Sequence, residues 1–310
     1  MVRVDRVEWL NLRDPQSAAL ALAAGEVDFV ENPGVEFLPM LEAAGTVVGR
    51  KDSLGTQGIL RMNHLQPPFN DARARQALAH LVDQREMLQA MFGNPDIVRP
   101  CGAYFACGSP LGTAAGVSPP AGSDPRRARE LFQQAGYDGT PIVILRPTDI
   151  QFMNIGTLVL ASRLKAIGVA VDLQAMDFGT MAARRLSRAP PSRGCWHLGM
   201  TYWPASDLVD PVGNVPLQSS CDAAWAGWPC DAPLQAMIDQ FAAAQDDDAR
   251  RELAARIQAR ASETVPYVPL GEWLLPVAHS PLLEGVLEIP ATTVFWNISK
   301  SPVSADGSAR

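Results

Sequence analysis

The feature that most constrains the fold is the alternation of short apolar segments of strand type with longer segments of helical periodicity. Strand-type runs at residues 56–63, 141–149 and 169–177 are separated by segments whose apolar residues recur every three or four positions. Alternation of this kind favours strands that helices connect and cover. The sequence therefore predicts an α/β fold, and we find no internal repeat.

Several elements can be placed from local signals. Residues 2–12 alternate apolar and polar side chains and predict a strand; a helix and a second strand at residues 28–33 follow, as in a parallel β-α-β unit. Asp71 begins a long amphipathic helix that we expect to end at Gly93. The closing segments, residues 267–280 and 285–300, are predicted strands.

Composition narrows the classes of partner. The chain has 310 residues, 47% of them hydrophobic, and 26 Lys and Arg against 33 Asp and Glu, a net charge of −7. It can bury a core, and its length suggests two domains. Basic residues occur only in scattered pairs, so nucleic acid is not an expected partner. No run approaches the roughly 20 apolar residues that span a bilayer, and the start lacks the apolar segment of a signal peptide, so we expect any export signal to have been removed.

Four of the five cysteines form two close pairs inside segments rich in Gly and Pro: Cys101 with Cys107, and Cys221 with Cys230. Neither spacing is the C-x-x-C of a zinc or thioredoxin-like site. Irregular loops allow the Cα separation of about 5–6 Å that a disulfide needs. The pattern predicts two disulfides, a leftover Cys195 and an oxidising compartment. Buried free thiols in a cytosolic protein are the alternative.

No catalytic motif emerges from the sequence. The histidines at positions 64, 80, 197 and 279 are scattered, and there is no G-x-S-x-G, phosphate-binding loop or dinucleotide fingerprint. We therefore expect no enzyme, no cofactor and no metal. A hydrolase with an unrecognised site and a protein-interaction module remain as alternatives.

Aromatic residues gather in loops and at strand ends. Tyr202 and Trp203 end a predicted strand, Trp225 and Trp228 lie between two cysteines, and Trp273 follows a Gly-Glu pair. Such side chains can line a small-ligand cleft. The alternative is that they cap the core, especially at Trp225 and Trp228.

Segments in a fixed order resemble the extracellular solute-binding proteins of family 5, which serve peptide-, dipeptide- and nickel-type ABC importers. They are LALAAGEVDFVENP, MNHLQPPFNDARARQALAHLVDQREM, DPRRARELFQQAGYDG, RLKAIGVAVDL, TVPYVPLGEW and GVLEIPATTVFWNISK. The resemblance covers nearly the whole chain, from residue 2 to residue 300.

The resemblance implies a class II periplasmic binding protein fold of the dipeptide- and oligopeptide-binding type. Residues 53–274 would form a complete second lobe, and residues 1–52 and 275–310 would form part of a first lobe whose N-terminal portion is missing. Strands around residues 55–63 and 268–273 would form the hinge about which the lobes close on a solute.

The resemblance also implies site residues. Peptide-binding relatives hold the peptide amino group with an aspartate after a strand; the matching stretch, GMTYWPASDLVDP, makes Asp207 the candidate and Asp210 the more secure match. Arg146 would meet the peptide carboxylate, and Asp149 beside it is as plausible a contact with the solute. Each could instead be a solvated loop charge, and Asp71 and Arg75 are better explained by helix capping and surface pairing. The other candidate ligand-binding residues are Asn63, Tyr202, Trp203, Glu272 and Trp273.

The expected function is that of a periplasmic solute-binding protein that captures a di- or oligopeptide-like solute and delivers it to ABC permease subunits, as a monomer. Because one lobe is expected to be incomplete, we expect the chain to bind this solute weakly or not at all.

Overall fold

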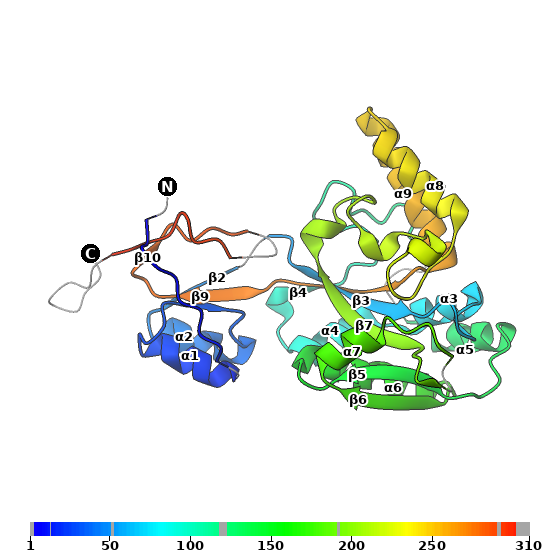
Figure 1. Cartoon of the computed structure of the whole chain (residues 1–310), viewed down its shortest axis with the longest axis horizontal. Coiled ribbons are helices and arrows are strands. Elements are labelled where there is room, and N and C mark those ends of the chain that lie inside the picture. Colours follow the sequence, from blue (N-terminus) through cyan, green and yellow to red (C-terminus); the bar gives the residue numbers. More distant parts are fainter. Residues whose placement is uncertain are drawn as a thin grey trace. The chain divides into compact units, whose positions relative to one another are not determined.

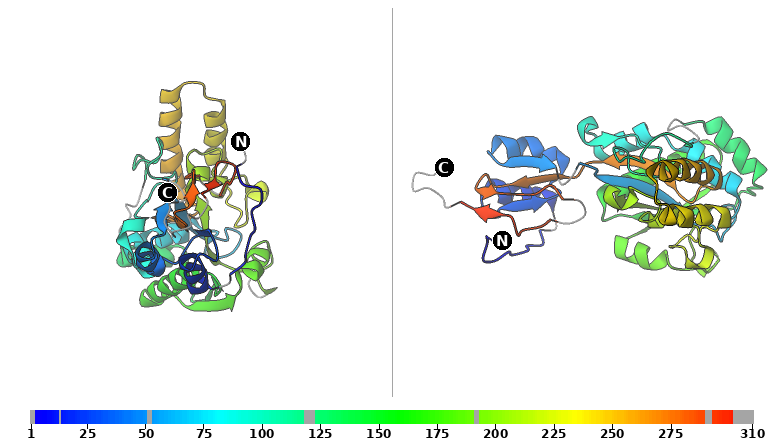
Figure 2. Two further views of the ribbon diagram at one scale, coloured as in Figure 1. Left: turned by 90° about the vertical axis from the view of Figure 1, so that its left-hand side faces the viewer. Right: turned by 90° about the horizontal axis from the view of Figure 1, so that it is seen from above.

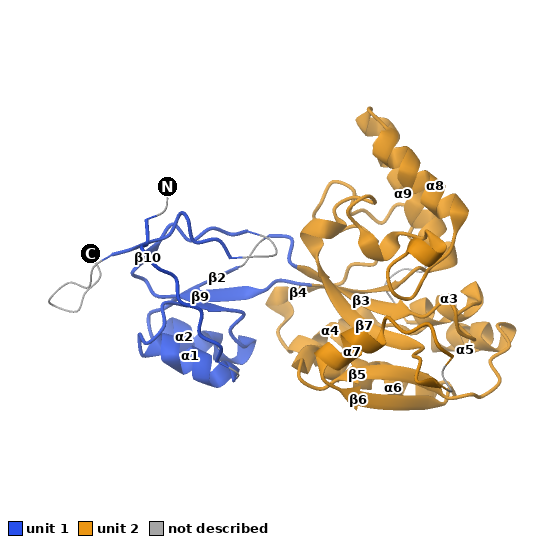
Figure 3. Cartoon of the chain, in the orientation of Figure 1, with its two compact units in different colours: residues 1–55, 273–310 blue, residues 56–272 orange. Residues whose placement is uncertain are grey.

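The computed structural model describes residues 3–12, 14–50, 53–117, 123–190, 193–289 and 293–301 (Figure 1). The chain divides into two compact units, Met1–Gly55 with Trp273–Arg310 and Thr56–Glu272 (Figure 3). These divisions fall within three residues of the lobe boundaries that the resemblance implies. That the smaller unit is part of a larger lobe stays a prediction.

The larger unit is built on a six-stranded sheet with the order β4-β8-β3-β7-β5-β6. Strand β5 (Ile142–Pro147) runs parallel to β6 (Val171–Met176) and to β7 (Leu198–Pro204). Strand β3 (Thr56–Met62) runs antiparallel to β7. The remaining strands are β4 (Val98–Arg99) and β8 (Val268–Trp273).

Helices cover both faces of this sheet. Because side chains alternate along a strand, Ile59 and Thr201 lie on one face while Leu60 and Met200 lie on the other. The Ile59 face packs in one hydrophobic cluster with α8 and α9, which project side by side in both views (Figures 1 and 2). The opposite face meets α6, where a Cβ on Gly156 would lie 2.6 Å from Met200 Cε. The helices are α3 (Ala72–Leu81), α4 (Gln84–Phe92), α5 (Pro125–Gln134), α6 (Gln151–Ala166), α7 (Phe178–Arg184), α8 (Ala232–Ala243) and α9 (Asp247–Thr264), with 3-10 turns at Pro95–Ile97, Ala205–Leu208, Val215–Leu217 and Cys221–Ala223.

The smaller unit is an antiparallel sheet with the order β1-β9-β2 and a small core formed by Ala19, Leu22, Val30, Leu41 and Ala278. Its elements are α1 (Pro15–Ala23), β1 (Phe29–Glu31), a 3-10 turn at Val35–Phe37, α2 (Leu38–Ala43), β2 (Val47–Arg50), β9 (Pro276–His279), β10 (Leu283–Glu284) and β11 (Ser299–Lys300).

The structure corrects three expectations of secondary structure. Residues 3–12 form no strand, and β1 pairs antiparallel with β9, so the expected β-α-β unit is wrong. The helix expected from Asp71 to Gly93 breaks at Val82, whose ψ of 124° is extended, and Asp83 caps α4 through the Glu86 N–H. Of the strand expected at residues 285–300, the described part contains only β11. Alternation in a sequence supplies no strand partner, and without one an apolar run stays irregular.

No helix in the described part of the chain combines the length and apolar character that crossing a membrane requires.

Candidate functional site

One edge of the larger unit's sheet gathers most of the candidate residues. The carboxyl ends of the parallel strands β5 and β7 lie at this end of the sheet; Arg146 directly follows the Leu145–Gly199 pair, and β7 continues beyond that pair to Pro204. Gln57, at the start of β3, pairs with Trp203, and its Nε2 donates a hydrogen bond to Glu272 Oε1 at 3.5 Å. The residues that this edge brings together are Arg146, Asp149, Tyr202, Trp203, Asp207, Asp210 and Glu272.

Asn63 lies at the opposite end of the sheet. It follows the last residue of β3, and its backbone N–H donates to His197 O just before β7 begins. The Asn63 side chain is fully buried; it donates to Trp196 O (3.2 Å) and Cys195 Sγ (3.1 Å). These bonds connect the end of β3 to the residues just before β7. Asn63 therefore lies apart from the other candidates.

Tyr202 and Trp203 point to opposite faces of the sheet, as neighbours in a strand must. Tyr202 lies edge-on to Phe152 of α6, with 5.4 Å between the ring centroids. Trp203 lies edge-on to Trp225 at 5.2 Å. The two aromatic side chains therefore cannot form a single wall, and each belongs to a different side of the sheet edge.

The two aspartates after β7 have different surroundings. Asp210 accepts hydrogen bonds from the N–H groups of Val212 (2.8 Å) and Gly213 (2.9 Å), which fixes a turn. Asp207 is exposed, and its carboxylate meets only the Ser206 hydroxyl at 3.2 Å and no cationic side chain within the described residues. Asp207 is therefore the one whose charge is available for a cation.

On the Tyr202 face, Arg146 is a cation with an unfilled donor. Its Nε is buried and has no hydrogen-bond partner in the described part of the chain, and the side-chain oxygen of Asn154 on α6 is in the same situation. Asp149 instead accepts a hydrogen bond from the Phe178 N–H (2.8 Å) and so fixes the start of α7. Buried polar atoms normally have partners, so a polar ligand or water would complete this face.

Glu272 is fully buried and its oxygens are occupied. It accepts from Arg99 Nε at 2.6 Å and from the Cys107 N–H at 2.9 Å, in addition to its Gln57 neighbour. Burial raises the pKa of Glu272, and this effect is larger than the lowering of the pKa by these hydrogen-bond donors. These bonds hold a loop on the sheet. Trp273, which ends β8, is buried and falls in the smaller unit.

Both expected disulfides are present and stabilise loops of the larger unit. The Cα atoms are 6.0 Å apart in Cys101–Cys107 and 4.0 Å apart in Cys221–Cys230, and Cys195 is a buried free thiol. Cys101, Cys107 and Glu272 lie close enough to hold a metal, but the disulfide removes both thiolates as ligands.

Three of the histidines form hydrogen bonds with the backbone. His64 Nε2 lies 3.3 Å from Pro266 O, His197 Nδ1 accepts from the Val143 N–H, and His279 Nδ1 lies 2.9 Å from Ser280 O. These bonds pair none of the three with a nucleophilic side chain, so this geometry gives no support to the hydrolase alternative.

Sequence reasoning missed a cationic aromatic cluster beside Trp203. The guanidinium carbons of Arg61 and Arg185 lie 4.9 and 4.5 Å from the Trp225 ring centroid. Neither arginine belongs to a recognisable motif, and only the register of β3 against β7 brings Arg61 to this side of the sheet.

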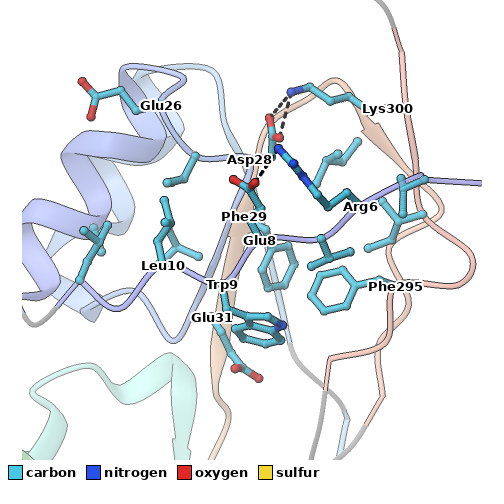
Figure 4. Close-up of a pocket in the computed structure, with 18 residues that line it drawn as sticks. Arg6, Glu8, Trp9, Leu10, Glu26, Asp28, Phe29, Glu31, Phe295 and Lys300 are labelled. Carbon is cyan, nitrogen blue, oxygen red and sulfur yellow. Dashed lines mark hydrogen bonds and ion pairs between the residues drawn. The ribbon is translucent and has the colours of Figure 1, made fainter.

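A separate pocket of about 560 Å³ lies within the smaller unit (Figure 4). Residues 4–12 form one wall, and Trp9 lies edge-on to Phe295 with centroids 5.6 Å apart. None of the sequence candidates lines it. Two ion pairs lie among its residues, Arg6 with Glu8 (2.6 Å) and Lys300 with Asp28 (2.8 Å).

The mixed α/β architecture matches the class II periplasmic binding protein fold of the dipeptide- and oligopeptide-binding type. Residues 1–225 match the middle region of a family of substrate-binding transporter components, and the chain belongs to that family: the bacterial extracellular solute-binding proteins, family 5.

Individual relatives agree with this assignment. A probable peptide ABC transporter periplasmic-binding protein of Sinorhizobium fredii is 36% identical over 97% of this chain and 57% of its own length. The substrate-binding protein CtaP of Listeria monocytogenes has a similar fold, with a TM-score of 0.79 and 19% identity over 93% of this chain and 59% of that one. The periplasmic binding protein DppA of Helicobacter pylori, solved with the peptide STSA, gives 0.77 and 19% over 93% and 56%. The chain thus spans less than two thirds of the length of these relatives.

Proposed function

We propose that this chain is the solute-binding part of an ABC importer that takes up a peptide-like solute and passes it to permease subunits. Membership of family 5 and the peptide-binding name of the Sinorhizobium relative support this proposal. The observation that carries it is the sheet edge on which an unpaired carboxylate, Asp207, and an arginine with an unfilled donor, Arg146, flank aromatic side chains.

The roles follow from charge. A peptide carries an ammonium group at one end and a carboxylate at the other. Asp207 would bind the ammonium group and Arg146 the carboxylate, because hydrogen bonds between ionised groups are the strong ones. Two disulfides support a location outside the cytoplasm, which we propose to be the periplasm.

We further propose that the smaller unit belongs to a larger lobe. Its exposed apolar side chains, Trp9 and Trp296 among them, would be covered by polypeptide that the relatives have beyond the part matched here. The hinge expected where the chain passes between the units stays a prediction.

The first test compares the tripeptide Ala-Ala-Ala with its N-acetyl form by NMR titration of the 15N-labelled chain, a method that detects weak binding. We expect the free peptide to bind more tightly, and Asp207→Asn to remove the difference, with a loss of about 10- to 100-fold for the free peptide. Asp222→Asn, an exposed aspartate of the same unit, is the control and should keep the preference. Equal binding of both peptides to all three proteins would contradict the role of Asp207.

A further inference from the structure

The cluster around Trp225 contains two cations in different states. Arg61 is fully buried, and backbone carbonyls occupy its donors: Nε meets Ala226 O at 2.8 Å, Nη2 meets Trp225 O at 3.0 Å, and Nη1 meets both Pro216 O and Pro266 O. The absence of a side chain at Gly227 leaves room for Arg61: the φ of Gly227 is +106°, and a Cβ there would lie 2.7 Å from Arg61 Nε. Arg61 is therefore a structural residue that attaches the Trp225 loop to β3.

Arg185 has no such partners. Its Nε and Nη1 are buried and have no hydrogen-bond acceptor among the described residues, and no described carboxylate forms an ion pair with it. Burial lowers the pKa of Arg185, as expected for a cation taken partly out of water. A guanidinium nevertheless keeps its charge and all its donors, so it needs an acceptor.

The arginines next to Arg185 in the sequence differ from it in this respect. Arg184 Nε donates to Gly194 O at 2.8 Å. Arg188 pairs with Asp222 at 2.5 Å while it lies over the ring of Trp228. Arg188 thus lies over an indole ring, as Arg185 does, but it also has a carboxylate as its ion-pair partner.

The side chains around Arg185 border solvent. Arg185, Trp203 and Trp225 are each partly exposed, while Nε and Nη1 of Arg185 are themselves buried, so an anion reaches these two donors only when neighbouring side chains move. The two indoles provide flat apolar surface beside the guanidinium group, and Arg61 adds a second positive charge that no described anion balances. An anion would relieve the repulsion between the two cations and fill the donors of Arg185.

We propose that Arg185, together with Trp203 and Trp225, binds an acidic group of the solute, so that the preferred solute is a peptide with a carboxylate side chain. This inference rests on the proposed function. It adds a site on the Trp203 face of the sheet, whereas Arg146, by the register of β5 against β7, lies on the Tyr202 face.

The first experiment tests the carboxylate site without any peptide. Benzoate and its neutral counterpart benzamide are titrated into the 15N-labelled chain, and the indole N–H signals of its seven tryptophans are followed, with Trp225→Phe to assign the signal of Trp225. We expect benzoate to shift the Trp225 signal saturably and benzamide to bind at least tenfold more weakly. Arg185→Gln should abolish the preference; Arg188→Gln, the matched control, should keep it. A benzoate shift that Arg185→Gln leaves unchanged, or no shift, would overturn the site.

The second experiment tests the solute class with Ala-Glu-Ala and Ala-Gln-Ala. We expect the chain and Arg188→Gln to prefer the glutamate peptide at least tenfold, and Arg185→Gln to bind both alike. Equal binding of the two peptides to the unaltered chain would overturn this inference and leave the proposed function standing. If neither peptide binds while benzoate still depends on Arg185, the peptide solute fails and the carboxylate site holds. Arg185→Lys, which keeps the charge, should retain part of the preference.

Discussion

At the residue scale, a buried histidine contributes to the way in which the stability of the larger unit depends on pH. His197 is 2% exposed, and its Nδ1 accepts a hydrogen bond from the Val143 N–H at 2.9 Å, which requires the unprotonated nitrogen. Burial lowers the pKa of His197 below its ordinary value of 6.5. Above pH 6.5 the folded and unfolded states are both neutral, and as pH falls below this value the unfolded state binds the proton first. The free energy of unfolding should therefore decrease as pH falls below 6.5.

His197→Asn tests this account, since an amide oxygen can accept the Val143 N–H without titrating. We expect urea unfolding to show a smaller loss of stability between neutral pH and about pH 5 than in the unaltered chain. His64, whose pKa burial also lowers, should leave a residual dependence in both proteins. Identical pH profiles would contradict a contribution from His197.

Also at this scale, residue type and position in the chain could suggest the site but not its geometry. Asp207 was a candidate because the stretch GMTYWPASDLVDP resembles that of peptide-binding relatives, and it lies in the 3-10 turn that follows β7. Asn63 was grouped with the other candidates, but it lies at the other end of the sheet, because the sequence does not give the antiparallel direction of β3 against β7. No sequence motif marks Arg185. Its proposed role rests on the absence of hydrogen-bond acceptors for its Nε and Nη1 among the described residues, whereas the neighbouring arginines have acceptors.

At the scale of elements, the cysteine pairs were predictable because short spacings in irregular loops leave few other partners. We expect the denatured, unreduced chain to react with iodoacetamide at one thiol, Cys195, and at five after reduction. Mass spectrometry counts the adducts. Five labelled thiols without a reductant would contradict both disulfides.

Cys221→Ser with Cys230→Ser, which frees the loop that carries Trp225, should lower the free energy of unfolding by about 2–3 kcal/mol, because the unfolded chain gains loop entropy.

Helix starts were predicted better than helix ends. Asp71 and Asp124 cap α3 and α5 through backbone N–H groups, as their sequence positions suggest. The break at Val82 was missed because the apolar periodicity continues through it. An aspartate is tolerated in a helix interior and is also favourable as an N-cap, so the residue type at Asp83 does not reveal that α4 begins there.

At the scale of the whole molecule, the α/β class was predictable from the alternation of elements, and the parallel pair β5–β6 with α6 between them confirms it. The antiparallel pairs were not predictable, since β9 reaches β1 and β2 from more than 200 residues away in the chain. Local patterning sets which segments are strands, and only the packed core decides which strands meet.

The last prediction concerns the smaller unit, in which several large apolar side chains are exposed to solvent. Trp9 is 70% exposed, Leu10 62% and Trp296 58%, beside the pocket that residues 4–12 help to line. If the rest of a larger lobe covers this face, the chain alone should bind the dye ANS, and Trp9→Ser with Leu10→Ser should reduce the fluorescence at least twofold, because apolar contact area is lost. Leu186→Ser, which alters a 68% exposed leucine of the larger unit, is the control and should leave the signal unchanged. An equal loss in both proteins would place the dye elsewhere and contradict a covered face at Trp9.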